Sequence, residues 1–446
     1  MSPTGPNQAS LGRSLFHMTW PMIFGVLAQM TFQLVDSIFI SRLGVEPLAA
    51  LGFTVPVYQL AIGLQVGVGI ATTALISRAV GAGDALRARR LGGLVVVAGG
   101  ALMLLFCLLS WLFRRPLLGA LGPEASLMPV IDSYWLPWLA SAWAGAMAYF
   151  AYSVSRAHGD TRFPGLMMVV TSLINLILDP LFIFGFGWGL PGAALATIAA
   201  FGFGAVLAYQ HLTRRRWLAL DLQALPAIPA LRQLAGISGP AMVGQLMPAL
   251  AAMLATSLIA RFGAAAVGAW ALATRLEFFS IVVVLGLTMS LPPMIGRLLG
   301  LGDLKQARTL VRMAVRFVLL LQLAVAAVWF ALSGVLPTLL TPDREVASIL
   351  GTYMWLVPVS YGALGVCMLM VSVCNALALP MRALFISLVR LFICYLPALW
   401  LGAQVAGLYG IFAGALVGNL GAGAGSYLLY RRGMARVAAA HCAHAH

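Results

Sequence analysis

The chain has 446 residues, of which 62% are hydrophobic and only 9% are charged, and its mean hydropathy is +0.98. No water-soluble core needs that much apolar surface, so the composition excludes an ordinary soluble domain and predicts a chain solvated largely by lipid. The formal net charge of +15 would suit a nucleic-acid-binding protein, but the placement of the basic residues along the chain argues against that function.

Apolar runs of about 20 residues, long enough to cross a bilayer as helices, recur along the chain between charged or Gly/Pro-rich breaks. In the first half we expect spans at 19–40, 48–75, 92–112, 131–153, 165–184 and 192–210. In the second half we expect spans at 239–260, 265–291, 317–336, 350–373, 384–401 and 407–429. The predicted fold is therefore an all-α integral membrane protein with twelve transmembrane helices.

The sequence of the first half repeats in the second half at a constant offset, equal to the distance along the sequence from Pro21 to Pro240. The match needs no gap from position 21 to position 84. The same offset pairs Arg42 with Arg261, Arg78 with Arg297, and the turn Gly81-Gly83-Asp84 with Gly300-Gly302-Asp303. An even number of spans in each half means that both halves enter the membrane in the same direction. This predicts two parallel six-helix lobes related by a pseudo-two-fold axis along the membrane normal, as in parallel-repeat transporters.

The expected domain organisation follows from this repeat. An N-terminal lobe of residues 1–213 is followed by a cytoplasmic linker of residues 214–238 and a C-terminal lobe of residues 239–446. The linker mixes prolines and charges among apolar residues, which is typical of a segment lying on the membrane surface.

Basic residues are distributed unequally between the two sides of the membrane. Twenty of the 27 fall on the side that would hold the N-terminus, and five fall on the other side, namely Arg42, Arg114, Arg115, Arg261 and Arg344. By the positive-inside rule both termini are then cytoplasmic. The basic charge is thus interpreted as a topology signal and a contact with membrane lipid, and we expect no nucleic-acid partner.

The cysteines and the N-terminus add no further chemistry. Cys107, Cys367, Cys374 and Cys394 fall inside predicted spans and Cys442 lies in the tail, and none has the spacing of a disulfide or metal ligand. We therefore expect no metal site and no cofactor. Residues 1–18 lack the apolar core of a signal peptide, so the first apolar run is expected to stay as a helix.

Four carboxylates fall within the predicted spans: Asp36, Asp132, Asp179 and Glu277. Ionisable groups inside a membrane are costly, so each is a candidate functional residue. Asp36 and Asp179 both lie about one turn before the outer end of a helix that runs outward, so they share one depth at about 1.5 Å per residue. Asp132 lies near the outer end of its helix, where an interfacial role is expected.

Two further polar residues lie at that depth. Asn175 precedes Asp179 by one helical turn, and Thr197 reaches a similar level on the next helix. The repeat places Ala255 at the position that matches Asp36, and the neighbourhoods of Asp179 and Thr197 match those of Ala398 and Ala415 in the second half. This asymmetry favours a specialised site in the N-terminal lobe, although for Asn175 and Thr197 a structural hydrogen bond explains the residue equally well.

The chemistry open to such a group is protonation or cation binding. Low dielectric and a second nearby carboxylate favour the protonated form of a carboxyl group. Carboxylate, amide and hydroxyl oxygens are also suitable ligands for Na⁺. The residues alone leave both ions open.

Candidates for a substrate cleft are weaker. Glu277 has no charged counterpart in the repeat, and either a cationic substrate or a buried arginine such as Arg390 would give it a partner. Aromatic faces at Tyr58 and Tyr134 suit a cationic drug, and Met289 would give an adaptable apolar surface. Packing against lipid or neighbouring helices is the alternative for each of them.

Three stretches resemble multidrug and toxic compound extrusion (MATE) transporters. They run from Gln33 to Gly44, from Arg156 to Arg162, and from Asn175 to Gly185, the last containing Asn-Leu-Ile-Leu-Asp-Pro-Leu. The resemblance implies cation-coupled export of amphiphilic, often cationic molecules by two six-helix lobes around a central cleft. No cofactor other than the coupling ion is implied.

Within that family the chain is most similar to the DNA-damage-inducible F-type branch. The resemblance implies that Asp36, Asn175, Asp179 and Thr197 form the proton or sodium site. The NorM-type branch has an acidic residue in helix 7, and this chain has none between Gly239 and Ala260.

Other function classes fit the sequence less well. Asp36 and Asp179 lack the Gly-X-Gly-Asp surroundings of intramembrane aspartyl proteases, and a channel would not need a polar site in one lobe only. A flippase for lipid-linked intermediates of related fold is the nearest alternative, but it would need a more cationic cleft than Arg275 and Arg390 supply. We expect a monomeric antiporter of the bacterial inner membrane, with a small-molecule substrate and no enzymatic activity.

Overall fold

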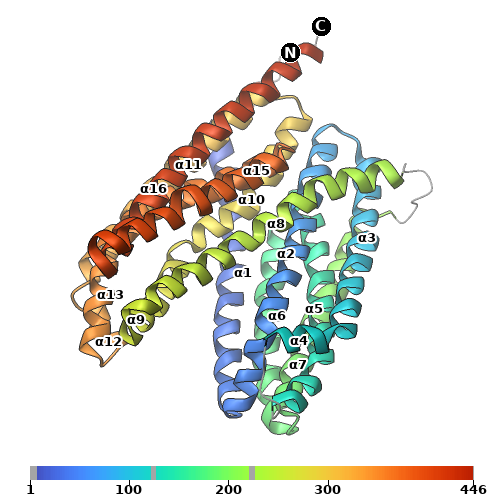
Figure 1. Cartoon of the computed structure of the whole chain (residues 1–446). Coiled ribbons are helices and arrows are strands. Elements are labelled where there is room, and N and C mark those ends of the chain that lie inside the picture. The colour runs from blue at the N-terminus through green and yellow to red at the C-terminus, as the bar shows by residue number, and fades with distance from the viewer. Residues whose placement is uncertain (1–7, 122–126, 220–226, 445–446) are drawn as a thin grey trace. The chain divides into compact units, whose positions relative to one another are not determined.

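The computed structural model describes residues 8–121, 127–219 and 227–444 (Figure 1). Within these residues every regular element is a helix. The chain divides into two compact units: an N-terminal unit, Phe16–Met242, and a C-terminal unit, Val243–His446 together with Met1–Leu15. The expected boundaries at 213 and 239 stay a prediction, and residues 220–226 of the expected linker lie outside the described residues.

The N-terminal unit contains most of the first helix and the elements that follow it. They are α1 (Gln8–Ser41), α2 (Val45–Gly81), α3 (Ala85–Leu112), α4 (Arg114–Leu121), α5 (Met128–Ala157), α6 (Arg162–Pro180), the π-helix η2 (Leu181–Gly185) and α7 (Gly189–Arg214). Helix α5 packs against α2, α3 and α7 and forms the scaffold of the unit. Most of its C-terminal half, from Ala144 to Ala157, is buried.

The C-terminal unit is built from more interrupted helices. Helix α8 (Ala227–Ile259) leads into it, and the elements that follow are η3 (Ala260–Phe262), α9 (Ala264–Ser280), α10 (Val282–Gly300), α11 (Leu304–Leu332), α12 (Leu336–Leu340), α13 (Arg344–Leu356), η4 (Val357–Ser360), α14 (Tyr361–Ala376), α15 (Pro380–Leu388), η5 (Val389–Tyr395) and α16 (Leu396–His444). Helix α16 is bent at Ala406 and Gly407, where the backbone leaves helical geometry.

The prediction of twelve spans is confirmed, since each predicted span lies on helical elements. Ten described segments are long and apolar enough to cross a membrane by composition alone. Helix α5 is not among them, because its Trp, Tyr and Ser residues lower its hydropathy. The segment Pro380–Ala435 counts as one but holds two predicted spans on either side of the bend at Gly407.

The repeated Gly-X-Gly-Asp turns have the same geometry in both units. Gly83 and Gly302 have φ values of +78° and +76°, a conformation that glycine adopts without strain. Asp84 then accepts a hydrogen bond from Arg87 N at 3.0 Å, and Asp303 accepts one from Gln306 N at 2.9 Å. In both turns the aspartate is therefore the N-cap of the helix that follows.

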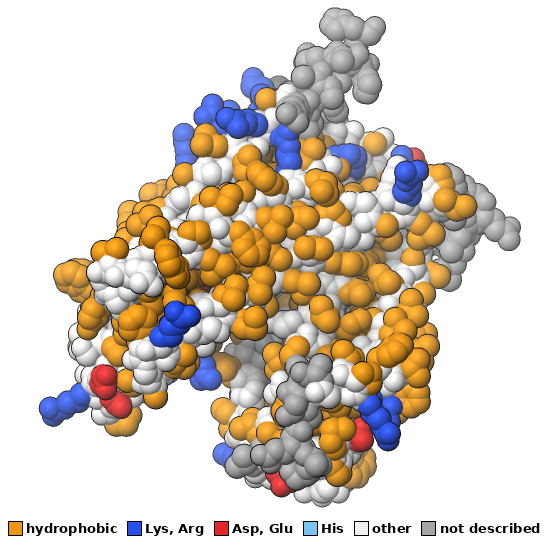
Figure 2. All heavy atoms as spheres, viewed as in Figure 1, with side chains coloured by type: hydrophobic (Ala, Val, Ile, Leu, Met, Phe, Trp, Pro, Cys, Tyr) orange, Lys and Arg blue, Asp and Glu red, His pale blue; other side chains and the backbone are white. Residues whose placement is uncertain are grey.

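Large apolar side chains are exposed on helices throughout both units. Figure 2 shows hydrophobic side chains over most of the visible face, with charged side chains toward the helix ends. On α3, for example, Leu104 and Leu108 are 57% and 56% exposed. A soluble monomer does not expose such continuous apolar surface, so these faces are suited to lipid.

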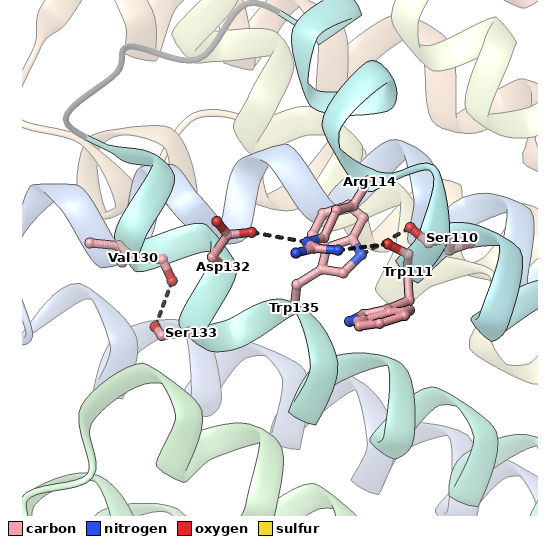
Figure 3. Close-up of polar contacts among 7 residues, drawn as sticks. All are labelled: Ser110, Trp111, Arg114, Val130, Asp132, Ser133 and Trp135. Carbon is pink, nitrogen blue, oxygen red and sulfur yellow. Dashed lines mark hydrogen bonds and ion pairs between the residues drawn. The ribbon is translucent and has the colours of Figure 1, made fainter.

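Asp132 is part of a polar cluster where α4 and α5 begin (Figure 3). Its Oδ1 lies 3.2 Å from Arg114 Nε, and Arg114 Nη1 donates to Trp111 O at 3.1 Å. Both charged side chains are partly exposed. This salt bridge gives Asp132 a partner at the end of the helix and agrees with the expected interfacial role.

Candidate functional site

Helices α1 and α6 lie side by side and run in the same direction. A side chain at Gly165 would collide with the backbone carbonyl of Pro21, so glycine is needed at this close approach. Further along, the rings of Phe39 and Phe184 meet edge to face at 6.3 Å. Asp36 follows Pro21 and Asp179 follows Gly165 at nearly equal distances along their helices, so the two carboxyl groups reach the same level.

Asp36 and Asp179 therefore lie at the same level of the N-terminal unit. The Asp36 and Asp179 carboxyl groups lie close enough to interact electrostatically with each other. Asp179 is fully buried, whereas Asp36 is half-buried. The Oδ1 atom of Asp36 is enclosed and has no hydrogen-bond partner among the described residues, so it is free to hold a proton or accept a donor.

Helices α6 and α7 form an antiparallel pair that places Asn175 opposite Thr197. The carboxamide of Asn175 lies between the Thr197 hydroxyl and the Asp179 carboxyl group, and Asn175 is 1% exposed. Directly after Asp179 the chain passes through Pro180, which lacks an amide hydrogen, into the π-helix η2. Such local π-turns occur frequently at functional sites, and this one was not predicted from the sequence.

The Asn175 carboxamide can be placed in two orientations, and the one with its nitrogen toward Asp179 satisfies both of its neighbours. With its nitrogen toward Asp179, Asn175 donates to both carboxylate oxygens at 2.8 Å, and its oxygen accepts from Thr197 Oγ1 at 3.0 Å. With the carboxamide turned, its nitrogen donates to Thr197 Oγ1 at 3.0 Å, and Thr197 donates to Ala193 O at 3.0 Å. The second orientation brings the Asn175 oxygen against Asp179, which requires a protonated carboxyl group.

The tyrosines predicted as weak cleft candidates lie near this site. Tyr58 on α2 interacts electrostatically with Asp36, and Tyr134 on α5 interacts with both carboxyl groups. Tyr134 is buried, whereas Tyr58 is 38% exposed. The structure therefore brings six of the predicted residues together in the N-terminal unit, with Asn175 and Thr197 in direct contact.

The other two cleft candidates, Glu277 and Met289, belong to the C-terminal unit. Glu277 is half-buried and accepts a hydrogen bond from the Tyr353 hydroxyl at 3.0 Å through Oε2. Tyr353 in turn lies 3.1 Å from the Tyr361 hydroxyl. Met289 is half-buried on α10. Neither tyrosine was predicted from the sequence, although Tyr353 occupies the repeat position of Tyr134.

A second polar cluster that was not predicted from the sequence lies where α5, α6 and α7 end on the same side. Asp160 Oδ2 pairs with His211 Nε2 at 3.0 Å, and the Phe163 ring stacks on His211 at 4.0 Å. His158 stacks on Trp217 at 4.6 Å. Burial lowers the pKa of His158, although its hydrogen bond to a backbone carbonyl opposes the shift. Through these contacts Trp217, at the start of the expected linker of residues 214–238, packs against the turn between α5 and α6.

A family model described as MatE matches residues 21–181 and 240–418 of this chain. The chain belongs to the MatE family. The matched segments include Asp36, Asn175 and Asp179 of the polar site, and most of the C-terminal unit. Family membership makes the protein a multi-pass membrane transporter and not an enzyme.

Individual relatives agree with this assignment. The chain is 32% identical over 443 residues to the FAD transporter of Shewanella oneidensis, with 95% of each chain covered. It is 23% identical over 286 residues to the multidrug export protein MepA of Staphylococcus aureus, covering 64% of this chain and 63% of MepA. Among solved structures it is similar to the Vibrio cholerae MATE transporter VcmN in the bent form, at 54% identity and a TM-score of 0.94, covering 96% of this chain and 98% of VcmN.

Proposed function

We propose that the protein is a proton-coupled antiporter that exports amphiphilic, often cationic molecules. The observation that carries this proposal is the carboxyl pair of Asp36 and Asp179, joined through Asn175 to Thr197. Two carboxyl groups at this range share a proton more readily than they carry two charges. Sodium remains the alternative ion, since the same four side chains supply oxygen ligands.

Entry of a proton down its gradient is coupled to transport through a change in the hydrogen bonds of α6 and α7. When Asp179 is ionised, Asn175 turns its nitrogen to the carboxylate and Thr197 donates to Asn175. When Asp179 is protonated, it donates to Asn175, which turns and donates to Thr197, and Thr197 then donates to Ala193 O. The charge on the Asp179 carboxyl group thus determines which groups donate and which accept in the hydrogen bonds that link Asp179, Asn175 and Thr197.

Asp36 connects this change to α1. Neutralising the pair removes the charge repulsion that separates Asp36 from Asp179 and allows α1 to reorder, with Pro21 as the point where its backbone hydrogen bonding is interrupted. In our proposal the protonated, reordered state releases substrate outside and the empty, deprotonated state reloads inside. VcmN has been crystallised in a form described as bent, and also as an Asp-to-Asn mutant, which supports more than one conformation among such transporters.

The substrate is proposed as a drug-like cation by similarity to MepA and by the aromatic and acidic groups near Asp36. A flavin nucleotide is the second candidate, because the relative described as an FAD transporter is similar over nearly the whole chain. The phosphates of such a substrate would need basic groups, and Arg275 and Arg390 are the arginines within the predicted spans of the C-terminal half. A flippase for lipid-linked intermediates would draw on the same arginines.

We further propose the F-type branch for this chain, a bacterial inner-membrane location with both termini cytoplasmic, and function as a monomer in contact with lipid. The supporting features are the polar site in the N-terminal unit and the excess of arginine on one side of the membrane. Cysteine labelling of single sites at residues 13 and 115 from each side of intact vesicles tests the orientation.

Efflux from proteoliposomes with an imposed proton gradient, and separately with a Na⁺ gradient, tests the proposed function. A fluorescent cationic dye and FAD serve as substrates, and wild type is compared with Asp36→Asn and Asp179→Asn. Proton-driven efflux that is lost in both variants is expected. Full-rate transport in these variants would overturn the mechanism, and transport driven only by Na⁺ would change the ion.

A further inference from the structure

We infer that the C-terminal unit holds a second proton-binding site, formed by Glu277 with Tyr353 and Tyr361. This inference rests on the proposed function, because it adds a proton to the same transport cycle. The site uses none of the residues of the carboxyl pair in the N-terminal unit, so each site can be tested without the other.

Three interrupted helices surround Glu277. Helix α9 ends at Ser280, less than one turn after Glu277, and Ile281 then leaves helical geometry with φ −94° and ψ 4°. The 3₁₀ turn η4 separates α13 from α14, with Tyr353 before it and Tyr361 after it. The π-helix η5 supplies Tyr395, which interacts electrostatically with Glu277. Broken helices in membrane transporters commonly mark ion and substrate sites.

Other side chains satisfy the polar groups that these breaks expose. Gln322 Nε2 donates to Ser280 O at 2.9 Å, and Trp329 Nε1 donates to Ser280 Oγ at 2.7 Å. Asn419 Nδ2 donates to Ser360 Oγ at 3.0 Å. Since these breaks are stabilised without Glu277, its carboxylate is not needed to repair the backbone.

The hydrogen bonds at Glu277 can rearrange to accommodate a proton on its carboxyl group. Tyr353 donates its hydroxyl hydrogen to Glu277 Oε2 at 3.0 Å, and either hydroxyl of the Tyr353–Tyr361 pair can donate to the other at 3.1 Å. A protonated Glu277 would donate to Tyr353 instead, which would then donate to Tyr361. A cation would need acceptor oxygens at this point, whereas Tyr353 presents a donor.

The charged and titratable groups on the surrounding elements leave Glu277 without a contact ion pair. Among the described residues, no basic group forms a salt bridge with its carboxylate. Arg390 on η5 interacts with it electrostatically and lines a cavity of about 30 Å³ with Ser387 and Tyr395, which is room for a water molecule. The other charged groups on α9, on η3 and at the start of α13 are Arg275, Arg261, Asp343, Arg344 and Glu345, all exposed.

The repeat indicates that the two sites are equivalent in position. Glu277 occupies the repeat position of Tyr58, and Tyr353 occupies that of Tyr134. In the N-terminal unit both tyrosines interact with Asp36 of α1. In the C-terminal unit α8 has Ala255 at the position of Asp36, and the carboxylate comes from α9 instead. Each unit therefore places one half-buried carboxylate beside the tyrosine that the repeat has in common.

The test measures protonation of Glu277 directly in a chain whose first site is silent. Purified Asp36→Asn/Asp179→Asn protein in lipid is followed by infrared spectroscopy between about pH 6 and 9, where exposed carboxyl groups, with pKa values near 4, are already ionised. We expect a protonated-carboxyl C=O band that disappears as the pH rises. Adding Glu277→Gln should remove it, and adding Glu345→Gln, an exposed carboxylate of α13, should leave it unchanged.

Tyr353→Phe is a second variant for the case in which Glu277→Gln does not fold. It removes the donor that favours the ionised carboxylate, so the midpoint of the band should move to higher pH. In otherwise wild-type proteoliposomes, Glu277→Gln should lower the number of protons counted per exported molecule. Absence of the band in the double variant, or its persistence after Glu277→Gln, would overturn the inference. A band that responds to Na⁺ at constant pH would overturn it in favour of a cation site, and the carboxyl pair of the N-terminal unit would be unaffected by any of these results.

Discussion

Replacing Thr197 with valine tests the hydrogen-bond chain of the N-terminal unit, because valine keeps the shape of threonine and removes its hydroxyl group. In the protonated state that we propose, Thr197 takes part in two hydrogen bonds, accepting from Asn175 and donating to Ala193 O. In the ionised state it makes one, donating to the Asn175 oxygen. The substitution therefore removes one more hydrogen bond from the protonated state than from the ionised state.

The expected size of this effect follows from that difference. One net hydrogen bond is worth about 1 kcal/mol, and about 1.36 kcal/mol corresponds to one pH unit of proton affinity. The pH at which proton-driven efflux is half-maximal should therefore fall by about 0.7 unit in Thr197→Val. Thr197→Ser keeps the hydroxyl group and should leave the midpoint where it is in wild type.

The assay is dye efflux from proteoliposomes over a series of external pH values, with the amount of folded protein checked by size-exclusion chromatography. An unchanged midpoint in Thr197→Val would refute the reasoning, as would a shift to higher pH. An equal shift in Thr197→Ser would show that side-chain packing, and not the hydroxyl group, sets the midpoint.

Three further substitutions test other parts of the structure. Asp132→Asn breaks a partly exposed salt bridge and should cost at most about 1 kcal/mol, so the melting temperature should move slightly and efflux should stay at the wild-type rate. The pKa of His158 is lowered in the folded protein, so the unfolded chain binds a proton at this histidine more tightly, and stability should fall as the pH drops below about 6.5. His158→Phe keeps an aromatic ring without a titrating group. In thermal unfolding at pH 7 and pH 5.5, this variant should show a smaller loss of stability than wild type. Gly165→Ala should cost about 1–3 kcal/mol and reduce proton-driven efflux, because its Cβ meets the backbone of Pro21; Gly202→Ala on α7 has open space and is the matched control, with no loss of stability expected.

The spans could be predicted from the sequence because lipid requires long apolar runs, and this requirement is visible in composition alone. The common depth of Asp36 and Asp179 could be predicted as well, since rise per residue depends little on side chains. Whether the two carboxyl groups face each other depends on the rotation of α1 and α6, which the contact of Gly165 with Pro21 sets. A contact between residues so far apart in sequence does not alter the hydrophobic periodicity of either helix. The depth of the site could therefore be predicted from the sequence, but its hydrogen bonds could not.

The interrupted helices were less accessible to prediction for a related reason. The spans predicted at 265–291 and 350–373 are each continuous in hydropathy, but the structure divides the first at Ile281 and the second at η4. Gln322 and Asn419 from other helices stabilise these breaks. A break maintained by distant partners does not alter the local hydrophobic pattern, and only Pro358 within η4 gives a local signal for it.

Comparing the repeats position by position correctly found that Ala255 replaces Asp36, and from this the C-terminal half was interpreted as having no matching polar site. That interpretation assumed that an equivalent site must draw its carboxylate from the equivalent helix. A carboxylate at a given place in a lobe can, however, come from any of the helices that line that place. Glu277 enters from α9 beside Tyr353, where the N-terminal unit has Tyr58 beside Tyr134 and takes its carboxylate from α1. The two halves are therefore best compared by the residues that lie around each repeated tyrosine. A comparison of aligned positions alone misses a carboxylate that comes from a different helix in each half.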